Sequence, residues 1–180
     1  MSELTPKPSK ITGSAAPSEI VLILDNIRSL YNVGSMFRTA DGLGVAKLYL
    51  CGITGTPEQH GVQKVALGAE KTVPWEHVGR TWALVERLQR RGYRVVGLEK
   101  CPEAAAIGDF KPKFPLALVV GNEVNGLSPG LRRRLDAVLA LPMLGLKQSF
   151  NVAVACALAL YELRRPELVV KRGSGGAKRR

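Results

Sequence analysis

The run from Val152 to Leu160 contains only Val, Ala, Cys and Leu, and it strongly constrains how the chain can fold. Ser149 and Asn151, which come just before it, are residues that commonly cap the first turn of a helix. A helix that is apolar on every side has no solvated face, so we expect other elements to enclose it. The free N–H groups and the positive dipole end at its first turn favour a hydrogen-bond acceptor or a partial negative charge at that position. The pattern therefore fits two structures: a core helix with an ordinary N-cap, or a ligand-binding loop that packs against a buried helix.

Composition indicates one globular domain with a polyanionic partner. A chain of 180 residues with 46% hydrophobic and 23% charged residues is large enough to bury a substantial core. The net charge of +11 favours nucleic acid as the partner. The longest apolar run is too short to span a bilayer, and the N-terminus lacks the apolar core of a secretion signal. We therefore expect no membrane association.

The three cysteines are Cys51, Cys101 and Cys156, and no C-x-x-C pair occurs. This spacing predicts reduced thiols in a cytoplasmic protein rather than a disulfide framework or a zinc site. The two histidines, His60 and His77, lack the spacing of metal ligands and are interpreted as surface or capping residues. We therefore expect no metal.

Short apolar runs alternate with helical patterns along the chain. The predicted strands are 19–25, 47–51, 93–98, 115–120 and 137–141. The predicted helices are 31–43, a short one within 63–70, 81–91 with Trp82, Val85 and Leu88 inside, 128–135, and one that ends near Pro166. This order predicts an α/β fold with a mainly parallel sheet and helices on both faces. Residues 1–18 are interpreted as a flexible arm, 19–165 as the domain, and 166–180 as a flexible basic tail.

Ligands of such sheets bind beyond the carboxyl ends of the strands. Polar residues follow several of the predicted strands at that position, namely Asp25-Asn26, Glu99, Gly121-Asn122-Glu123 and the loop after Leu141. No G-x-G-x-x-G follows the first strand, no G-x-x-x-x-G-K-[ST] occurs, and Ser149 lacks a G-x-S-x-G context. The dinucleotide fold, the NTP phosphate loop and the hydrolase nucleophile are therefore disfavoured.

Three segments, in this order, resemble motifs 1, 2 and 3 of the SpoU, or TrmH-like, RNA 2′-O-ribose methyltransferases of the SPOUT class. They are 26–44 (NIRSLYNVGSMFRTADGLG), 118–128 (LVVGNEVNGLS) and 141–163 (LPMLGLKQSFNVAVACALALYEL). Any one of them alone would be only suggestive, whereas the ordered set of three is specific. The resemblance covers essentially residues 19–165.

The resemblance implies S-adenosylmethionine as the methyl donor, RNA as the substrate and a homodimer with the RNA site near the subunit interface. It also implies that roughly Leu116 to Tyr161 is threaded as a trefoil knot, which general rules of chain topology would not suggest. No metal is needed, because the sulfonium methyl is already an activated electrophile. The cofactor-binding residues implied by the motifs are Leu98, Gly121, Asn122, Leu141, Met143, Ser149 and Phe150.

By position in the motifs, the implied catalytic residues are Arg38, Asn32, Glu123, Ser149 and Asn151. The family arginine has been assigned as a general base, but a guanidinium has a pKa above about 12. We therefore favour the interpretation that Arg38 stabilises the developing alkoxide and clamps a phosphate. Three alternatives stay open, in which Arg38 is only a solvated helix arginine, Glu123 only caps a turn and Asn151 is only a helix cap.

Phe150 departs from the family pattern, which has Leu at this position. The side chain of Phe is also apolar but bulkier than that of Leu, so it is expected to reshape the pocket. Several basic groups are candidates for contacts with RNA phosphates, although each is equally well interpreted as a solvated face. These groups are Arg87, Arg90 and Arg91, Arg132-Arg133-Arg134, and the tail from Lys171 to Arg180.

The substrate is left open between tRNA, which we favour, and rRNA. Two other functions also stay open, a catalytically inert RNA-binding protein of the same class and an enzyme that methylates a base nitrogen. The motif 1 arginine disfavours the base methylase, and the intact set of Asn32, Arg38, Glu123 and Asn151 disfavours the inert protein.

Overall fold

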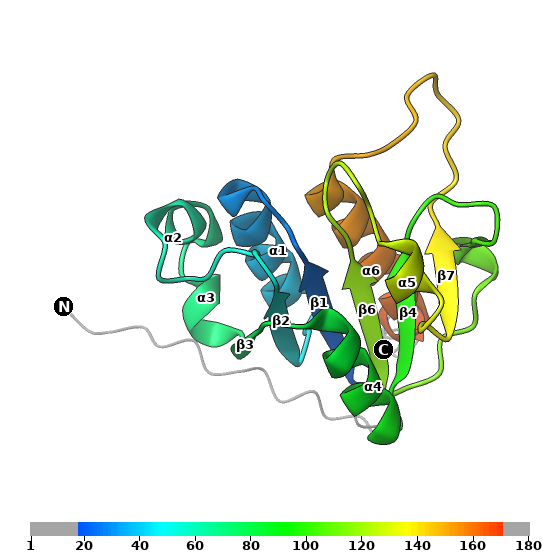
Figure 1. Cartoon of the computed structure of the whole chain (residues 1–180), viewed down its shortest axis with the longest axis horizontal. Coiled ribbons are helices and arrows are strands. Elements are labelled where there is room, and N and C mark those ends of the chain that lie inside the picture. The colour runs from blue at the N-terminus through cyan, green and yellow to red at the C-terminus, as the bar shows by residue number, and fades with distance from the viewer. Residues whose placement is uncertain (1–17, 171–180) are drawn as a thin grey trace, which may run out of the picture.

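A computed structural model describes residues 18–170, which form a seven-stranded sheet. Helices flank this sheet (Figure 1). The strand order is β3-β2-β1-β6-β4-β7-β5, and every pairing between neighbouring strands is parallel. The strands are β1 (Ile20–Asp25), β2 (Lys47–Cys51), β3 (Trp75–Val78), β4 (Arg94–Leu98), β5 (Ala105–Ala106), β6 (Leu116–Val120) and β7 (Ala137–Ala140). The predicted α/β class and parallel sheet are confirmed.

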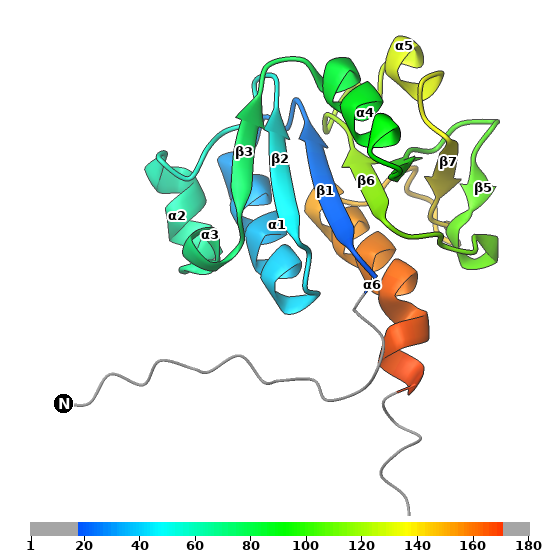
Figure 2. The same cartoon turned by 90° about the horizontal axis from the view of Figure 1, so that it is seen from below.

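The helices cover both faces of the sheet (Figure 2). They are α1 (Leu30–Gly42), α2 (His60–Ala66), α3 (Ala69–Thr72), α4 (Thr81–Arg90), α5 (Pro129–Arg132) and α6 (Val152–Val170). Helices α1, α2, α3 and α6 contribute to the larger core on one face, and α4 and α5 contribute to a second core on the other. The expectation of helices on both faces is therefore confirmed.

Strand β1 explains why this arrangement forms. All six of its residues are buried, and alternate side chains point to opposite faces of the sheet. Ile20, Leu22 and Leu24 belong to the core under α1 and α6, whereas Val21 and Ile23 belong to the core under α4. A strand that is buried on both faces is typical of a central position in a parallel sheet.

The sequence pattern missed the edge strands β3 and β5. Strand β3 is only partly buried and β5 has two residues, so neither produces a continuous apolar run. The orientation predicted for the helix over 81–91 was also partly wrong, because Trp82 is 43% exposed and Leu84 is buried instead. The buried positions Thr81, Leu84 and Leu88 share one helix face, and Trp82 lies about 100° away from Thr81 on the helix.

The prediction that the apolar helix is enclosed is wrong for this chain. On α6, Val154, Leu158 and Tyr161 are 49%, 44% and 57% exposed, and they share one side at positions i, i+4 and i+7. The opposite side, which includes Cys156, Ala159 and Leu160, is buried in the larger core. The described part of the chain supplies no element that covers the open side.

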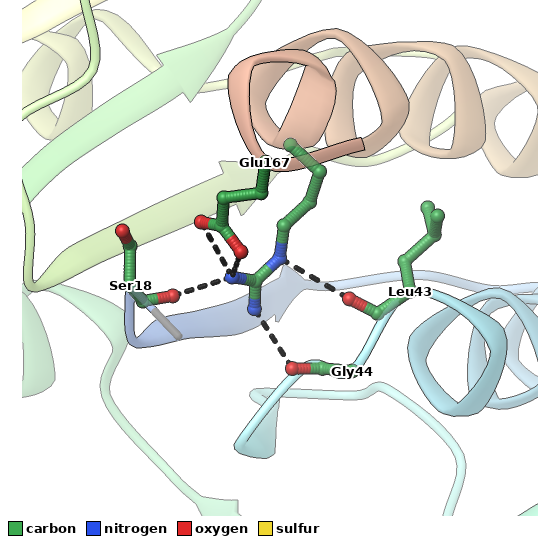
Figure 3. Close-up of polar contacts among 5 residues, drawn as sticks. Ser18, Leu43, Gly44 and Glu167 are labelled. Atoms are coloured by element: carbon green, nitrogen blue, oxygen red, sulfur yellow. Dashed lines mark hydrogen bonds and ion pairs between the residues drawn. The ribbon is translucent and has the colours of Figure 1, made fainter. Parts of the chain in front are cut away.

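The predicted end of this helix near Pro166 is also wrong, because α6 continues through Pro166 to Val170. The turn that contains the proline is anchored by Arg164, whose side chain is buried and whose polar contacts are drawn in Figure 3. The guanidinium donates hydrogen bonds to the carbonyl oxygens of Ser18, Leu43 and Gly44 and pairs with Glu167 at 3.1 Å. These contacts offset the one helix hydrogen bond that proline cannot make.

Residues 166–170, which the sequence assigned to the tail, are therefore helical and continue α6. The flexible arm predicted for 1–18 and the rest of the predicted tail lie outside the described residues, apart from Ser18. The trefoil knot stays a prediction. No helix between residues 18 and 170 has the length and apolar content needed to cross a bilayer.

Replacing Arg164 by Met should lower the free energy of unfolding by about 3 kcal/mol, because three carbonyl oxygens and the Glu167 carboxylate lose their donor. The matched control is Arg165→Met, one position along, where the side chain is 63% exposed and pairs with Glu162 on the surface. That change should cost no more than about 0.5 kcal/mol. Urea unfolding of both variants measures the difference, and equal losses would show that the buried contacts contribute little.

Candidate functional site

A cavity opens where the carboxyl ends of β4, β6 and β7 meet the first turns of α6. The segment 141–150, which connects β7 to α6, forms one of its walls and extends beyond the sheet edge (Figure 1). The position agrees with the expectation that ligands of a parallel sheet bind beyond the carboxyl ends of its strands.

The structure brings all seven residues predicted to bind a cofactor to this one cavity. They are Leu98 from the end of β4, Gly121 and Asn122 after β6, and Leu141, Met143, Ser149 and Phe150 from the segment after β7. Three parts of the sequence are thus joined, although about twenty residues or more separate each from the next. Phe150 is 40% exposed, so its ring forms part of the mouth of the cavity.

The chemical character of the lining is mixed. Leu98, Val120 and Leu141 provide an apolar wall, and Glu99, Lys100 and Gln148 provide charged and amide groups. A ligand with a flat apolar part and a charged zwitterionic part matches such a lining. Only glycine fits at position 121, because a Cβ there would lie 2.6 Å from the carbonyl carbon of Gly126 and 2.7 Å from the nitrogen of Leu127.

Glu123 connects motif 2 to motif 1. Its carboxylate oxygens accept hydrogen bonds from the backbone nitrogens of Arg28 and Ser29, each at 3.0 Å. One of them also accepts from the side-chain amide of Asn32 at 3.0 Å. Ser29 in turn caps α1 through its hydroxyl, which accepts from the Asn32 nitrogen. The carboxylate therefore fixes the loop after β6 against the start of α1.

These contacts determine the ionisation of Glu123. Partial burial raises the pKa of its carboxyl, but the N–H donors of Arg28 and Ser29 and the Asn32 amide outweigh that effect and hold the pKa below its ordinary value. Glu123 is therefore ionised at neutral pH and is a weak base. The geometry agrees with the alternative in which Glu123 caps a turn and positions other groups.

Asn151 makes the predicted cap contact and a second contact that the sequence did not predict. Its side-chain oxygen accepts from the nitrogen of Ala153 at 2.9 Å, as expected of a helix cap. Its amide nitrogen donates to the side-chain oxygen of Asn32 at 3.2 Å. Motif 3 is thereby connected to motif 1, and Glu123, Asn32 and Asn151 form a continuous chain of hydrogen bonds.

Arg38 lies apart from this chain of contacts. Its side chain is exposed, as the helical pattern indicates, and it lines a different hollow with residues of α2 and α3. Ser149 lines the first cavity and is exposed. Of the five predicted catalytic residues, the structure brings together Asn32, Glu123 and Asn151, places Ser149 in the cavity wall, and leaves Arg38 outside it.

Sequence reasoning missed Lys100, and it expected Glu99 at this sheet edge without including it among the cofactor-binding residues. Lys100 donates to the side-chain oxygen of Gln148 at 2.7 Å and so connects the end of β4 to the segment after β7. Glu99 accepts a hydrogen bond from the nitrogen of Leu127 at 2.7 Å and thus supports the loop after β6. The available signal was the position of Glu99-Lys100 directly after a buried strand. Within residues 18–170, no group of three or more potential metal ligands is brought together.

Comparison with known proteins agrees with this geometry. The model of the SpoU rRNA Methylase family matches residues 19–161. The tRNA (guanosine(18)-2′-O)-methyltransferase of Aquifex aeolicus is 30% identical over 147 residues, which are 82% of this chain and 69% of that protein. The 23S rRNA (guanosine-2′-O-)-methyltransferase RlmB of Vibrio vulnificus is 35% identical over 152 residues, 84% of this chain and 61% of that protein.

A solved structure shares the same fold. The crystal structure of an AdoMet-bound rRNA methyltransferase from Sinorhizobium meliloti superposes with a TM-score of 0.77 at 27% identity. The match covers 84% of this chain and 57% of that chain. The chain likewise spans only 57% to 61% of the length of several curated relatives that it matches.

Replacing Glu123 by Gln should weaken the contact between the two loops, because one side-chain oxygen replaces two acceptors. We expect the free energy of unfolding to fall by about 1 kcal/mol at neutral pH, since partial exposure to solvent reduces the strength of these hydrogen bonds. The folded-state pKa lies below the ordinary value of 4.5, so this stabilisation is complete above that value and is lost as the pH falls through the folded-state pKa.

Urea unfolding at about pH 7 and below about pH 4 measures this difference. The control is Glu58→Gln, at an exposed carboxylate that does not line the cavity, which should change stability by less than about 0.5 kcal/mol. A loss at Glu123 that did not depend on pH would contradict the assignment of the effect to the ionised carboxylate.

Proposed function

The chain belongs to the SpoU methylase family, and we propose that it transfers the methyl group of S-adenosylmethionine to a ribose 2′-oxygen of RNA. The observation that carries the proposal is that motifs 2 and 3 line one cavity at the sheet edge together with all seven predicted cofactor residues. Asn32 of motif 1 is hydrogen-bonded to Glu123 of motif 2 and to Asn151 of motif 3. The names of the Aquifex and Vibrio relatives specify 2′-O-methylation of a guanosine in tRNA and in 23S rRNA.

The cavity lining fits the methyl donor. Leu98, Leu141 and Phe150 offer apolar surface suited to an adenine ring. Because Gly121 has no side chain, the loop after β6 packs closely on itself and leaves space in the cavity for that ring. Glu99 and Lys100 offer charges for polar parts of the ligand. When bound, S-adenosylmethionine supplies an activated methyl group on a sulfonium.

The residues of the chain would then align the attacking ribose and manage its charge. Asn32 and Asn151 hold each other in place beside the cavity, and Glu123 keeps Asn32 oriented from the other side. We assign Glu123 a positioning role because both of its oxygens accept hydrogen bonds. Ser149 and the Asn151 amide would then contact the ribose.

Arg38 would contribute a positive charge that stabilises the developing alkoxide and binds the adjacent phosphate. A guanidinium remains protonated, so the proton of the 2′-hydroxyl would pass to that phosphate or to water. Because Arg38 lies outside the cavity of its own chain, we propose that it acts at the cavity of a second copy.

The open side of α6 supports a homodimer. Val154, Leu158 and Tyr161 form an apolar stripe that water covers in a single chain. A second copy that packs on this stripe would remove it from water, as in symmetric isologous dimers. The stripe starts one turn after Asn151, so such an interface would lie next to the first cavity.

The RNA class stays between tRNA, which we favour, and rRNA, because relatives of both kinds match to similar extents. Cytoplasmic location is proposed from the three unpaired cysteines, two of which are buried. The inert RNA-binding protein is the alternative, and the intact chain of contacts through Asn32 disfavours it.

Transfer of labelled methyl groups from S-adenosylmethionine onto fractionated tRNA and rRNA tests the function. We expect label in alkali-resistant dinucleotides, because a 2′-O-methyl group blocks cleavage of the neighbouring phosphodiester. Label in mononucleotides would favour base methylation instead. A protein that binds the donor by calorimetry but methylates no cellular RNA would overturn the proposal, and absence of donor binding would favour the inert protein.

Gly121→Ala serves as the variant for the same experiment. Its Cβ would push the backbone of Gly126 and Leu127 away, so donor affinity should fall at least about tenfold. Gly108→Ala is the control, because a Cβ there would have no atom within 4 Å. Equal donor affinity in the two variants would show that the loop after β6 does not shape the donor site.

The contribution of a second copy is tested by mixing Arg38→Ala with Asn151→Ala, each of which should be nearly inactive alone. If Arg38 acts at the partner's cavity, co-expressed variants should regain about a quarter of wild-type activity, since half of randomly formed dimers would carry one intact site. No recovery in dimers shown to be mixed would place Arg38 at the cavity of its own chain.

A further inference from the structure

A second hollow lies on the other side of the loop 121–126, next to the first cavity. Asn122 and Gly126 line both. The second hollow, which we call the α4–α5 groove, runs between the ends of β1 and β2 and the first turns of α4 and α5. Its volume of about 840 Å³ is within the range of ligand sites, about 300–1,000 Å³.

The groove is positively charged. Arg28, Arg80 and Arg134 line it and are exposed. Arg134 pairs with Glu86 at 3.6 Å, but the two side chains are 46% and 42% exposed, so the pair is weak. Arg28 and Arg80 have no ion pair with any residue between 18 and 170.

One carboxylate, that of Asp25, also lines the groove. It is 6% exposed, and it accepts hydrogen bonds from the hydroxyl of Thr81 and from the amide of Asn26. Its charge is therefore partly compensated by these donors and is outnumbered by the three guanidinium groups. The balance favours an anionic ligand.

An exposed aromatic ring lies in the same groove. Trp82, on the first turn of α4, is 43% exposed, and the guanidinium of Arg134 lies 5.9 Å from its ring centroid. The sequence pattern assigned this tryptophan to the core, and its exposure therefore calls for another explanation. An accessible indole beside guanidinium groups is typical of sites where an unpaired base stacks and its phosphate is bound.

We propose that the α4–α5 groove binds an unpaired nucleotide of the RNA substrate close to the methylated position. The base stacks on Trp82, and Arg80 and Arg134 hold the flanking phosphates. This inference rests on the proposed function, because it takes RNA as the substrate. Only the loop 121–126 separates the groove from the first cavity, so an RNA strand held in the groove lies close to a methyl donor bound in the cavity.

The sequence proposed several arginines equally as contacts for RNA phosphates, and the structure distinguishes Arg134 from the others because it lines the groove. Arg87 pairs with Glu76 at 3.1 Å, and Arg132 pairs with Glu103 at 3.0 Å. Arg90 lies at the opposite end of α4 and does not line the groove. Arg90 is therefore a matched control, because it is an exposed arginine on the same helix.

Fluorescence anisotropy of the full chain with a labelled single-stranded RNA oligonucleotide and with unfractionated tRNA tests the groove. Arg80→Ala and Arg134→Ala should each weaken binding about five-fold to ten-fold and reduce the dependence of log K on log salt by about 0.7 to 0.9. Trp82→Ala should weaken binding about tenfold with an unchanged salt dependence, and Trp82→Phe should restore most of the affinity. Arg90→Ala should change affinity less than about two-fold.

Donor binding by calorimetry and methyl transfer are measured on the same variants. Unchanged donor affinity with weaker RNA binding supports the groove. The proposed groove is contradicted if the Trp82→Ala and Arg80→Ala variants bind RNA as tightly as the wild type, or if Arg90→Ala weakens RNA binding to the same extent. It is also contradicted if the variants lose self-association instead of RNA binding. If the wild type binds RNA through these residues but never methylates ribose, the proposed function fails while the groove stands as an RNA site.

Discussion

The carboxylate of Glu123 is the contact on which the rest of the site depends. A helix begins with N–H groups that have no partner within the helix, and the turn before α1 presents two more, from Arg28 and Ser29. Glu123 satisfies both and also holds the side chain of Asn32, which in turn meets Asn151. The loop after β6, the start of α1 and the start of α6 are therefore fixed relative to one another.

This constraint gives the sheet edge its functional character. The strands run parallel, so their carboxyl ends bring together loops that are distant in the sequence. The loop 121–126 lies between two hollows, one with a mixed lining suited to a methyl donor and one lined by arginines and Trp82. A donor and a polyanionic acceptor can thus approach the same loop from opposite sides without competing for space.

Helix α6 illustrates the limits of reading one segment alone. Its composition predicts burial on all sides, yet Val154, Leu158 and Tyr161 remain open in the single chain. Apolar composition predicts that a surface is buried, but it does not predict whether the same chain or another copy buries it. Pro166 is a similar case, because the anchor at Arg164 depends on carbonyl groups near residues 18 and 43 that no local pattern connects to it.

The sequence by itself determined the alternation of strands and helices, the parallel sheet and seven of the residues that line the first cavity, because buried strands and ordered motifs leave local patterns. Only the tertiary structure decided that Glu123 positions other groups, that Asn151 both caps α6 and meets Asn32, that Trp82 is exposed, and that Arg38 lies outside its own cavity. Those outcomes depend on which segments meet in space, and contacts between residues about a hundred positions apart leave no signal in the spacing of either one.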